Sequence, residues 1–390
     1  MGKTSYSQNS GREYLFDTHC HLSPVVTHQR YENLKCQLKK KLDDEKSSDI
    51  WKHPCLNMMS TNFIDYQLIY DLSKDYPRFI NPNYGVHPWF SHLFTFEDFT
   101  QINEHLTQME IKRRHYSSVF QPKKQISDEL LLALPVPIYF PKFIKKIERF
   151  LLENPNSGIG EIGIDKVFRV PQCGYIGSKE CQEWINEPEL KSNIFERNER
   201  TDRSPFRTSM DHQVKILKQF LLLARKLNRH VSLHCVGNDG KLFNILNDVF
   251  KGDSYPSEWI DLHSYSGSTE QIKVYTKTFP HIKFSISKVL NMELHEERLQ
   301  KAFQLNYVDV SNILLETDLG LDGLYWEEPG NKSGKCEEDR YEFLISNKEG
   351  VQNRHTGLLK DTLEQLEKLE PRITLRKLNQ NYAKYLGLPN

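Results

Sequence analysis

The chain has 390 residues, of which 38% are hydrophobic and 27% are charged, and its 52 basic and 52 acidic residues cancel to a formal net charge of zero. This length allows one large barrel or two ordinary domains, and the composition indicates a globular core with long polar insertions. A zero net charge excludes attraction of a polyanion by a long-range basic field, so any nucleic acid must be bound at a local site.

The chain shows no pattern typical of a membrane protein. No apolar stretch approaches the roughly 18 residues of a membrane-spanning helix, so we expect no membrane contact. The seven cysteines are scattered, odd in number and without a CxxC pair. This pattern is typical of reduced thiols, and it predicts a cytoplasmic or nuclear location, or both.

Short apolar runs alternate with helical patterns along the chain. The predicted strands are 14–19, 54–61, 78–87, 157–164, 230–235, 259–264, 281–287 and 312–318. Helices are predicted at 142–153 and 212–228, and near 63–74, 239–250, 268–279, 295–304, 356–369 and 373–386. Strands alternating with helices predict an α/β fold with a parallel sheet, and eight such units predict a closed (β/α)8 TIM-type barrel. The alternative is an open doubly wound sheet, but no glycine-rich phosphate turn follows the first strand.

Three segments depart from this repeat, at about 91–141, 166–210 and 320–355. Each follows a predicted strand and precedes a predicted helix, so we expect all three on the C-terminal face of a single barrel spanning residues 1–390. The segment 166–210 holds 8 basic and 7 acidic residues, which argues against a phosphate site based on charge alone. A small basic cluster, residues 112–115 with 123–124, is interpreted as a solvated helix face.

Side chains that can bind a metal ion gather at the ends of the predicted strands. His19 and His21 are two residues apart, and on a strand such residues point to the same side, roughly 6–7 Å apart. Taken alone, the pair equally fits one buried histidine and one that caps the strand. Five further strands carry a possible ligand at or near their ends, and if the barrel is correct all of them face one mouth: His87, Glu161, His234, His263 and Asp318.

This mixture of imidazole and carboxylate groups predicts a divalent metal site. Nitrogen and oxygen ligands together suit one or two ions of zinc, manganese or magnesium and do not select among them. A glutamate placed between two ions can bridge them, which is typical of two-metal hydrolytic sites.

Six motifs strengthen this interpretation. In chain order they read DTHCHL, GVHPW, GEIGID, SLHC, HSYSG and LLETD. They resemble the motif set of the TatD-family metal-dependent hydrolases and deoxyribonucleases, which are amidohydrolase-like barrels. The run GEIGIDKVFRVP most resembles a fungal branch with members described as partners of a cell-cycle complex subunit. The resemblance covers nearly the whole chain apart from the insertions.

The resemblance implies a role for each candidate residue. His19, His21 and Asp318 would bind one ion, His234 and His263 the other, and Glu161 would bridge them. Hydrolysis of a phosphodiester, most simply at DNA ends, is the implied reaction. We expect Asp318 to be the general base, because it is a carboxylate beside the implied water, and His87 to position the scissile group.

The chain departs from the family pattern at positions near the substrate. Trp89 replaces a second histidine, Val236 replaces an arginine, and Leu319 and Gly320 replace a small residue and a proline. Loss of an arginine removes a bidentate contact to phosphate, whereas an aromatic ring can stack on an unpaired base. These changes predict weak nuclease activity with a preference for single strands or frayed ends.

Two alternatives follow from the same departures. The chain is either a weakly active or inactive barrel that binds a protein partner through its insertions, or a hydrolase of a substrate other than nucleic acid, such as an amide or an ester. Away from the strand ends, we expect four histidines to be surface groups: His92, His105, His115 and His355. Asp165 is expected either to hold a ligand or a loop in place or to cap a helix.

Overall fold

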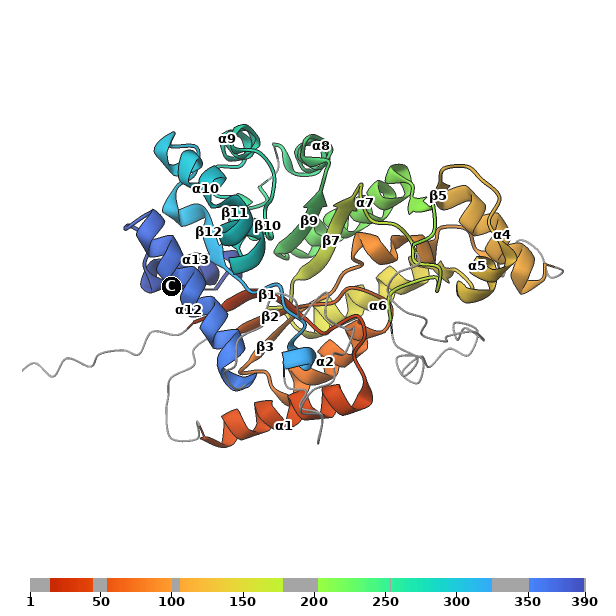
Figure 1. Ribbon diagram of the computed structural model, residues 1–390, viewed down its shortest axis with the longest axis horizontal. Helices are drawn as coiled ribbons and strands as arrows, with labels where there is room; N and C mark the ends of the chain where they lie inside the picture. Colours follow the sequence, from red (N-terminus) through yellow and green to blue (C-terminus); the bar gives the residue numbers. More distant parts are fainter. Residues whose placement is uncertain are drawn as a thin grey trace, which may run out of the picture.

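The computed structural model describes residues 15–44, 55–99, 106–177, 203–252, 254–324 and 351–388. Eight parallel strands form its centre (Figure 1). They are β1 (Asp17–His21), β2 (Leu56–Met59), β3 (Ile80–Asn83), β7 (Ile159–Asp165), β9 (Val231–Val236), β10 (Ile260–Leu262), β11 (Lys283–Ile286) and β12 (Ile313–Leu315). All eight predicted strands are therefore confirmed, at bounds that differ by a few residues.

Backbone hydrogen bonds close these strands into a barrel. The pairing order is β1-β2-β3 in one sheet and β7-β9-β10-β11-β12 in the other. Tyr84 N donates to Gly158 O over 3.1 Å, which joins the end of β3 to β7. His21 N donates to Leu319 O over 2.8 Å and Asp318 N to His19 O over 2.9 Å, which joins β12 to β1. The predicted (β/α)8 TIM-type barrel is confirmed.

Eight predicted helices are also present: α2 (Asp65–Asp75), α6 (Phe140–Glu153), α7 (Met210–Leu227), α8 (Asp239–Phe250), α9 (Thr269–Thr278), α10 (Leu294–Gln304), α12 (Val351–Leu369) and α13 (Leu375–Tyr385). In α6, for example, Phe143, Ile147 and Leu151 recur every four residues and are all buried against the core. A helix that we did not predict, α1 (His28–Asp44), buries Tyr31, Leu34 and Leu38 and carries many charged residues.

The insertion at 91–141 extends to one end of the molecule (Figure 1). It contains β4 (Phe94–Thr95), α4 (Gln108–Val119), β5 (Phe120–Gln121), α5 (Asp128–Ala133) and β6 (Ile138–Tyr139), and begins within the short helix η1 (Pro88–Leu93). The basic cluster there is engaged within the protein, because Arg113 pairs with Asp128 and Arg114 pairs with Glu97. Lys123 donates to two carbonyls at the end of α4. No helix among the described residues has the length and apolar character of a membrane span.

Three of the histidines expected at the surface are buried, which corrects that prediction. His92 bonds Gly174 O through Nε2 at 2.9 Å, and His115 bonds His92 O at 2.8 Å. These rings satisfy backbone carbonyls in segments that have little regular pairing, which is why they lie inside. His355, on α12, is buried beside Asp17 of β1, with 2.7 Å between its Nε2 and Oδ2 of Asp17. The fourth, His105, lies outside the described residues.

The barrel interior below the mouth is polar. Asn57 Oδ1 accepts hydrogen bonds from Nδ2 of both Asn81 and Asn83, each at 2.7 Å. Asn83 Oδ1 in turn lies 2.9 Å from Nε2 of His230. These bonds connect β2 and β3 to the start of β9, so the strands that carry the site are fixed relative to each other by side chains as well as by backbone pairing.

Candidate metal centre

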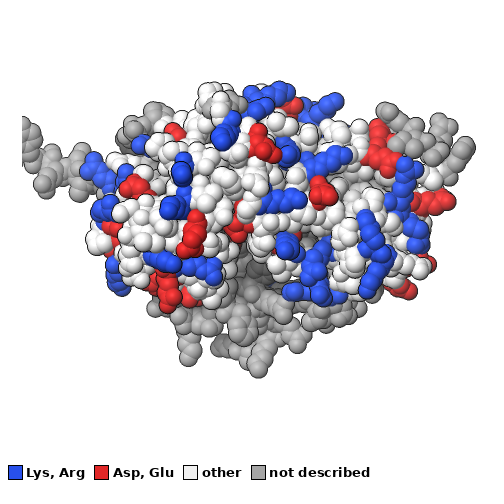
Figure 2. All heavy atoms as spheres, turned by 90° about the horizontal axis from the view of Figure 1, so that it is seen from above, with Lys and Arg blue, Asp and Glu red and all other residues white. Residues whose placement is uncertain are grey.

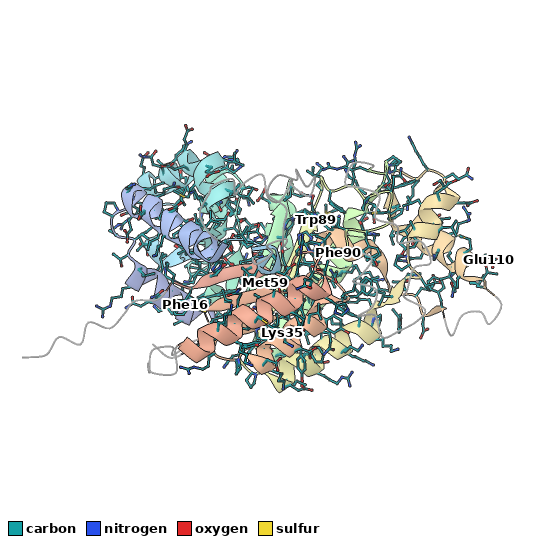
Figure 3. All side chains as sticks on the ribbon, turned by 60° about the horizontal axis from the view of Figure 1, so that its bottom comes forward. Phe16, Lys35, Met59, Trp89, Phe90 and Glu110 are labelled. Atoms are coloured by element: carbon teal, nitrogen blue, oxygen red, sulfur yellow. The ribbon has the colours of Figure 1, made fainter. Side chains whose placement is uncertain are left out.

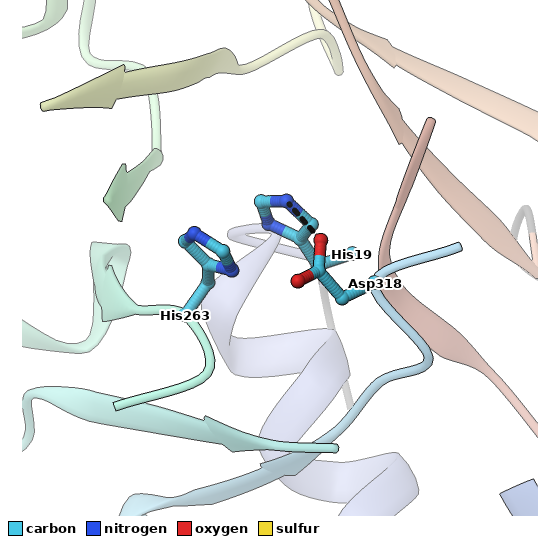
Figure 4. Close-up of side chains that lie close together, drawn as sticks. All are labelled: His19, His263 and Asp318. Carbon is cyan, nitrogen blue, oxygen red and sulfur yellow. Dashed lines mark ion pairs between the residues drawn. The ribbon is translucent and has the colours of Figure 1, made fainter. Parts of the chain in front are cut away.

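Strand β1 places two imidazoles at the centre of the mouth. His19 and His21 point to the same side of the strand, and their Nε2 atoms lie 2.8 Å apart. Cys20, between them, points the other way and is buried, with its thiol near Asn57 O. The predicted alternation on this strand is therefore observed. The His19 ring also stacks on His263 of the β10 end, with centroids 3.9 Å apart (Figure 4).

The two carboxylate oxygens of Glu161 face two different groups of histidines. Oε2 lies 3.1 Å from His21 Nε2 and 3.5 Å from His19 Nε2. Oε1 lies 2.7 Å from His263 Nε2, 2.9 Å from His234 Nδ1 and 3.2 Å from His87 Nε2. Glu161 itself is buried on β7. One carboxylate thus stands between two sets of ligand atoms, which is the arrangement of a bridging ligand.

Asp318 completes the group on the β1 side. Its Oδ1 lies 3.3 Å from His21 Nε2 and 3.8 Å from His19 Nε2, and its side chain is 27% exposed (Figure 4). Its backbone has φ of 57°, in the left-handed region that non-glycine residues seldom occupy. Such a conformation persists where the surrounding structure holds it, often at functional sites. All seven predicted site residues are therefore brought together at one mouth.

Glycine at one position of β7 allows the strands to approach closely enough for this arrangement. A side chain at Gly163 would place its Cβ 2.0 Å from the backbone oxygen of His234 on β9. Gly163 pairs with His234 in the sheet register, two residues after Glu161. The glycine of GEIGID therefore sets the distance between the strand of Glu161 and that of His234.

Hydrogen bonds on the outer ring nitrogens distinguish His21 from His87. Nδ1 of His21 faces the carbonyl of Met59 at 3.3 Å, so Nδ1 carries a proton, and in the neutral ring the lone pair lies on Nε2. Nδ1 of His87 instead accepts the backbone N–H of Trp89 at 3.1 Å, so the neutral ring carries its proton on Nε2. His21 is therefore suited to bind a metal ion, whereas His87 is suited to donate a hydrogen bond.

Burial and neighbouring groups shift the pKa values of the site residues. Burial alone would lower the pKa of His21, but hydrogen bonds to Asp318 and Glu161 raise it to about 10. Burial alone would raise the pKa of Glu161, but the imidazoles around it, His87, His263, His19 and His21, hold it well below its usual range. Burial lowers the pKa of His87 to about 4, so this ring is neutral at pH 7.

These residues fit a divalent ion. One buried carboxylate, Glu161, and one partly exposed carboxylate, Asp318, face the ring nitrogens of five imidazoles, and in the absence of an ion these carboxylates raise the pKa values of His21 and His263. A divalent ion would replace protons on these rings, since its ligands must be neutral imidazole and carboxylate. Three overlapping groups of ligand atoms lie close enough to hold an ion: His19, His263 and Asp318; His19, His21 and Glu161; and His87, Glu161 and His234.

Asp165 holds part of the site in place through contacts that could not be predicted from the sequence. Asp165 Oδ2 accepts the indole N–H of Trp89 at 2.7 Å and lies 3.5 Å from Nε2 of His234. Asp165 Oδ1 accepts the backbone N–H groups of Val167 and Phe168. Asp165 therefore contacts both a histidine and the following loop, as expected for a residue that holds a ligand or a loop in place, and it does not cap a helix.

Trp89 lies near the middle of the molecule beside Phe90, far from Glu110 of the insertion (Figure 3). One face of its ring is covered by Phe168, whose ring stacks on it at 4.9 Å. This contact covers one face of the Trp89 ring and so limits the base-stacking role that we expected of Trp89. Phe168 is itself partly exposed and could stack on a base in its place. Val236 follows His234 by two residues on β9 and pairs with Asp165, so alternation places it on the side of the site.

Comparison with known proteins agrees with this geometry. The family model described as "TatD related DNase" matches residues 16–381. The chain belongs to this family. The match includes every residue of the metal centre described above. The predicted resemblance is thus confirmed. The name of the family describes a nuclease, and this chain has a cluster of histidines and carboxylates that could hold a metal ion.

Two fungal proteins are similar over long stretches. The Cut9-interacting protein scn1 of Schizosaccharomyces pombe is 31% identical over 247 residues, which cover 57% of this chain and 67% of that protein. A Saccharomyces cerevisiae protein named as an uncharacterized deoxyribonuclease is 31% identical over 292 residues, covering 73% of this chain and 77% of that protein. Both similarities are to fungal proteins, as the run GEIGIDKVFRVP predicted.

Solved structures are less similar. The crystal structure of YJJV, a TatD homologue of Escherichia coli K12, aligns with a TM-score of 0.48 at 14% identity and covers 96% of this chain and 98% of that one. The phosphotriesterase homology protein of Escherichia coli aligns with a TM-score of 0.39 at 9% identity, covering 97% of this chain and 99% of that one.

Proposed function

We propose that this protein is a metal-dependent phosphodiesterase that hydrolyses DNA from its ends, and that residues 1–390 act as one hydrolase unit. The proposal rests on the position of the Glu161 carboxylate. One of its oxygens faces His19 and His21, and the other faces His234 and His263. A carboxylate shared in this way between two sets of ligand atoms suits in-line displacement at phosphorus.

In this proposal His19, His21 and Asp318 hold one divalent ion, His234 and His263 hold the other, and Glu161 contacts both. When bound, such ions lower the pKa of water to near neutrality and offset negative charge on a phosphoryl oxygen. Zinc, manganese and magnesium all remain compatible with these ligands, because mixed nitrogen and oxygen donors do not select one of them.

The protein's own groups supply the proton transfers. Desolvation alone would raise the pKa of Asp318, but the hydrogen bond from His21 and the nearby charges lower it, so the side chain is a carboxylate at neutral pH. Its partial exposure lets it accept a proton from water at the mouth. His87 donates from Nε2 towards the scissile phosphoryl group, because its Nδ1 is occupied by Trp89 N.

The test is hydrolysis of end-labelled DNA by protein that has been stripped with chelator and reloaded with manganese, magnesium or zinc. Glu161→Gln should bind less metal and lose nearly all hydrolysis, because a neutral amide cannot bridge two cations. Glu270→Gln is the matched control, since Glu270 is exposed on α9, and it should behave as wild type. Failure of the wild type to bind any divalent ion at micromolar concentration would reject the proposal.

A second candidate function is binding of a protein partner, with hydrolysis weak or absent. It is favoured by the similarity to a fungal protein whose name describes an interaction with Cut9. The same reloading experiment separates the two functions. Full metal content without hydrolysis of single-stranded DNA, duplex DNA or a simple phosphodiester would favour the binding function.

A further inference from the structure

The loop that follows β7, residues 166–169 with the sequence Lys-Val-Phe-Arg, lies at the rim of the mouth. Lys166 and Arg169 are exposed, and the apolar side chain of Val167 is 57% exposed between them. Phe168 is partly exposed, although one of its faces rests on Trp89. The loop thus presents apolar and basic side chains next to each other, directly after Asp165, whose Oδ2 lies 3.5 Å from Nε2 of His234.

A second stretch of the same insertion pairs with this loop. Ser204 N donates to Val170 O and Val170 N to Phe206 O, each at 2.9 Å. Arg207 Nε donates to Val167 O at 3.3 Å, and Arg203 lies opposite Pro171 in an antiparallel bridge. The pairing collects four cations on one edge of the mouth. We call these residues the basic rim: Lys166, Arg169, Arg203 and Arg207.

Charge is segregated along this insertion. Segments 166–177 and 203–210 contain four basic and no acidic residues, whereas all 7 acidic residues of 166–210 fall in 178–202, outside the described residues. Across the part of the chain that the structure describes, no carboxylate forms an ion pair with the basic rim. The face seen from above in Figure 2 likewise shows more Lys and Arg than Asp and Glu. The near balance of basic and acidic residues over 166–210, which argued against a phosphate site, therefore combines two basic segments with one acidic segment.

The loop is held in one conformation before any ligand arrives. Asp165 Oδ1 accepts Val167 N at 2.6 Å and Phe168 N at 2.9 Å. Val170, at the end of the loop, is fully buried. A preorganised surface loses less conformational entropy on binding than a free loop does.

We propose that the basic rim, together with Val167 and Phe168, binds a single-stranded segment of DNA beside the metal centre. The cations would contact successive phosphates, and the bases would rest on Val167 and on Phe168. This combination of charge and apolar or aromatic surface is the general solution for binding unpaired strands, because a base can lie flat on a side chain only when it is unpaired. The inference rests on the proposed function, since it names the surface that holds the substrate.

The position of the surface suits a strand that enters the site by its end. Ring centroids are 4.9 Å apart from Phe168 to Trp89 and 4.7 Å from Trp89 to His87, so Phe168 lies at most 9.6 Å from His87. Stacked nucleotides rise about 3.4 Å each, so this distance spans roughly three nucleotides. The rim would therefore hold the nucleotides next to the scissile bond.

Binding is measured without hydrolysis, by fluorescence anisotropy of a labelled ten-residue oligothymidylate with full-length protein in EDTA. Lys166→Ala combined with Arg169→Ala should raise Kd about tenfold and make the slope of log K against log salt shallower by about 1.4, since each phosphate contact on a single strand contributes about 0.7. The matched control is Lys251→Ala combined with Lys368→Ala, two exposed lysines that follow α8 and lie on α12, which should change Kd less than twofold.

The apolar part of the surface has its own test. Phe168→Ala should weaken binding of the oligothymidylate about tenfold but leave binding of an abasic oligonucleotide unchanged, whereas Phe168→Tyr should bind as wild type. Thermal melting of each variant shows whether it is folded. Equal loss on abasic and normal strands would mean that Phe168 acts only through the loop structure.

The inference is overturned if wild type does not bind the oligonucleotide, if rim and control variants weaken binding equally, or if blunt duplex binds as tightly through the same residues. Its failure is distinguishable from failure of the proposed function. Loss of binding in the rim variants, with no hydrolysis by metal-loaded wild type, would reject the phosphodiesterase and retain the binding surface. Hydrolysis that persists unchanged in the rim variants would retain the phosphodiesterase and reject the binding surface.

Discussion

The backbone N–H of Trp89 donates to Nδ1 of His87, and this bond gives His87 a different tautomer from His21 on the opposite side of Glu161. His21 ends β1 and His87 lies four residues after β3, directly before η1, and both present Nε2 to the same carboxylate at 3.1–3.2 Å. The bond on the far side of each ring decides which of them offers a lone pair and which offers a proton. Position in the barrel alone therefore does not define a ligand.

We predict that His87→Ala keeps its metal content but lowers turnover about 10²- to 10³-fold, as expected when one hydrogen-bond donor to a developing charge is removed. His87→Gln, whose amide keeps an N–H donor, should lose less. Elemental analysis and single-turnover rates on the same preparations separate the two effects. Loss of half the bound metal in His87→Ala would show that His87 is a ligand instead.

Asp165 should act as a positioning residue for His234. In Asp165→Asn, Oδ1 can still accept Val167 N and Phe168 N, but the new amide N–H group would face two other donors, Trp89 Nε1 and His234 Nε2. Loss of the partner that orients a metal-binding histidine typically costs 10- to 100-fold in metal affinity.

Competition with a metal chelator would measure the change in affinity. Trp89→Phe is the control for Asp165→Asn, since it keeps a ring against Phe168 and removes only the indole N–H. An unchanged affinity in Asp165→Asn would limit Asp165 to capping the loop.

Val236→Arg should raise the affinity for single-stranded DNA roughly ten- to a hundredfold, because a charge-assisted contact to phosphate contributes about 1.5–3 kcal/mol. The position lies on the site side of β9, beside Asp165, and carries no charge in this chain. Initial rates on labelled strands at fixed manganese and salt provide the measurement, with Val236→Met as the control for side-chain bulk. A lower rate on every DNA would contradict the argument that a missing phosphate contact weakens DNA binding by this protein.

Acid should destabilise the protein through its buried histidines. Burial lowers the pKa of His92 to about 4 and that of His115 to about 3, from an unfolded value of 6.5. Below pH 6.5 the unfolded chain takes up protons that these rings cannot accept in the folded state, so stability falls as pH falls towards their folded pKa values. At pH 5 each ring would cost about 2 kcal/mol of unfolding free energy relative to pH 7.

His115→Asn tests this effect, because its amide can still donate to the carbonyl of His92 but cannot be protonated. Urea denaturation at pH 7 and pH 5 should show a smaller difference for this variant than for wild type. His281→Asn, at an exposed position, is the control and should match wild type. An equal loss of stability in all three proteins would exclude His115 as the cause.

The sequence predicted the barrel well because each strand is a short apolar run followed by a polar residue at the mouth. His19, Glu161 and Asp318 could be assigned to one place without knowing any pairwise contact, since parallel strands in a closed barrel all end on the same side. The insertions were harder to predict. His92 and His115 fall outside the apolar runs of the predicted strands and were therefore interpreted as surface groups, and the carbonyls that they meet across the chain explain their burial.

Contacts between side chains from distant segments were also beyond the sequence. Trp89 was recognised as unusual, but its bond to Asp165, 76 positions later, depends on how η1 packs against β7. Phe168 gave no signal of its own because a single phenylalanine in a loop is common. The tautomer of His87 likewise depends on the turn at Pro88, which directs Trp89 N back to the ring.

The seam between β1 and β12 bears on how the protein is made. β1, which carries His19 and His21, bonds to Asp318 and Leu319, and its Asp17 pairs with His355. During synthesis the first strand must therefore wait with one open edge until most of the chain has left the ribosome. Contacts across such long sequence separations form slowly, and an unpaired edge invites association with other chains. A nascent chain stalled before residue 318 would thus lack Asp318 beside His19 and His21, and the candidate metal centre would be complete only late in translation.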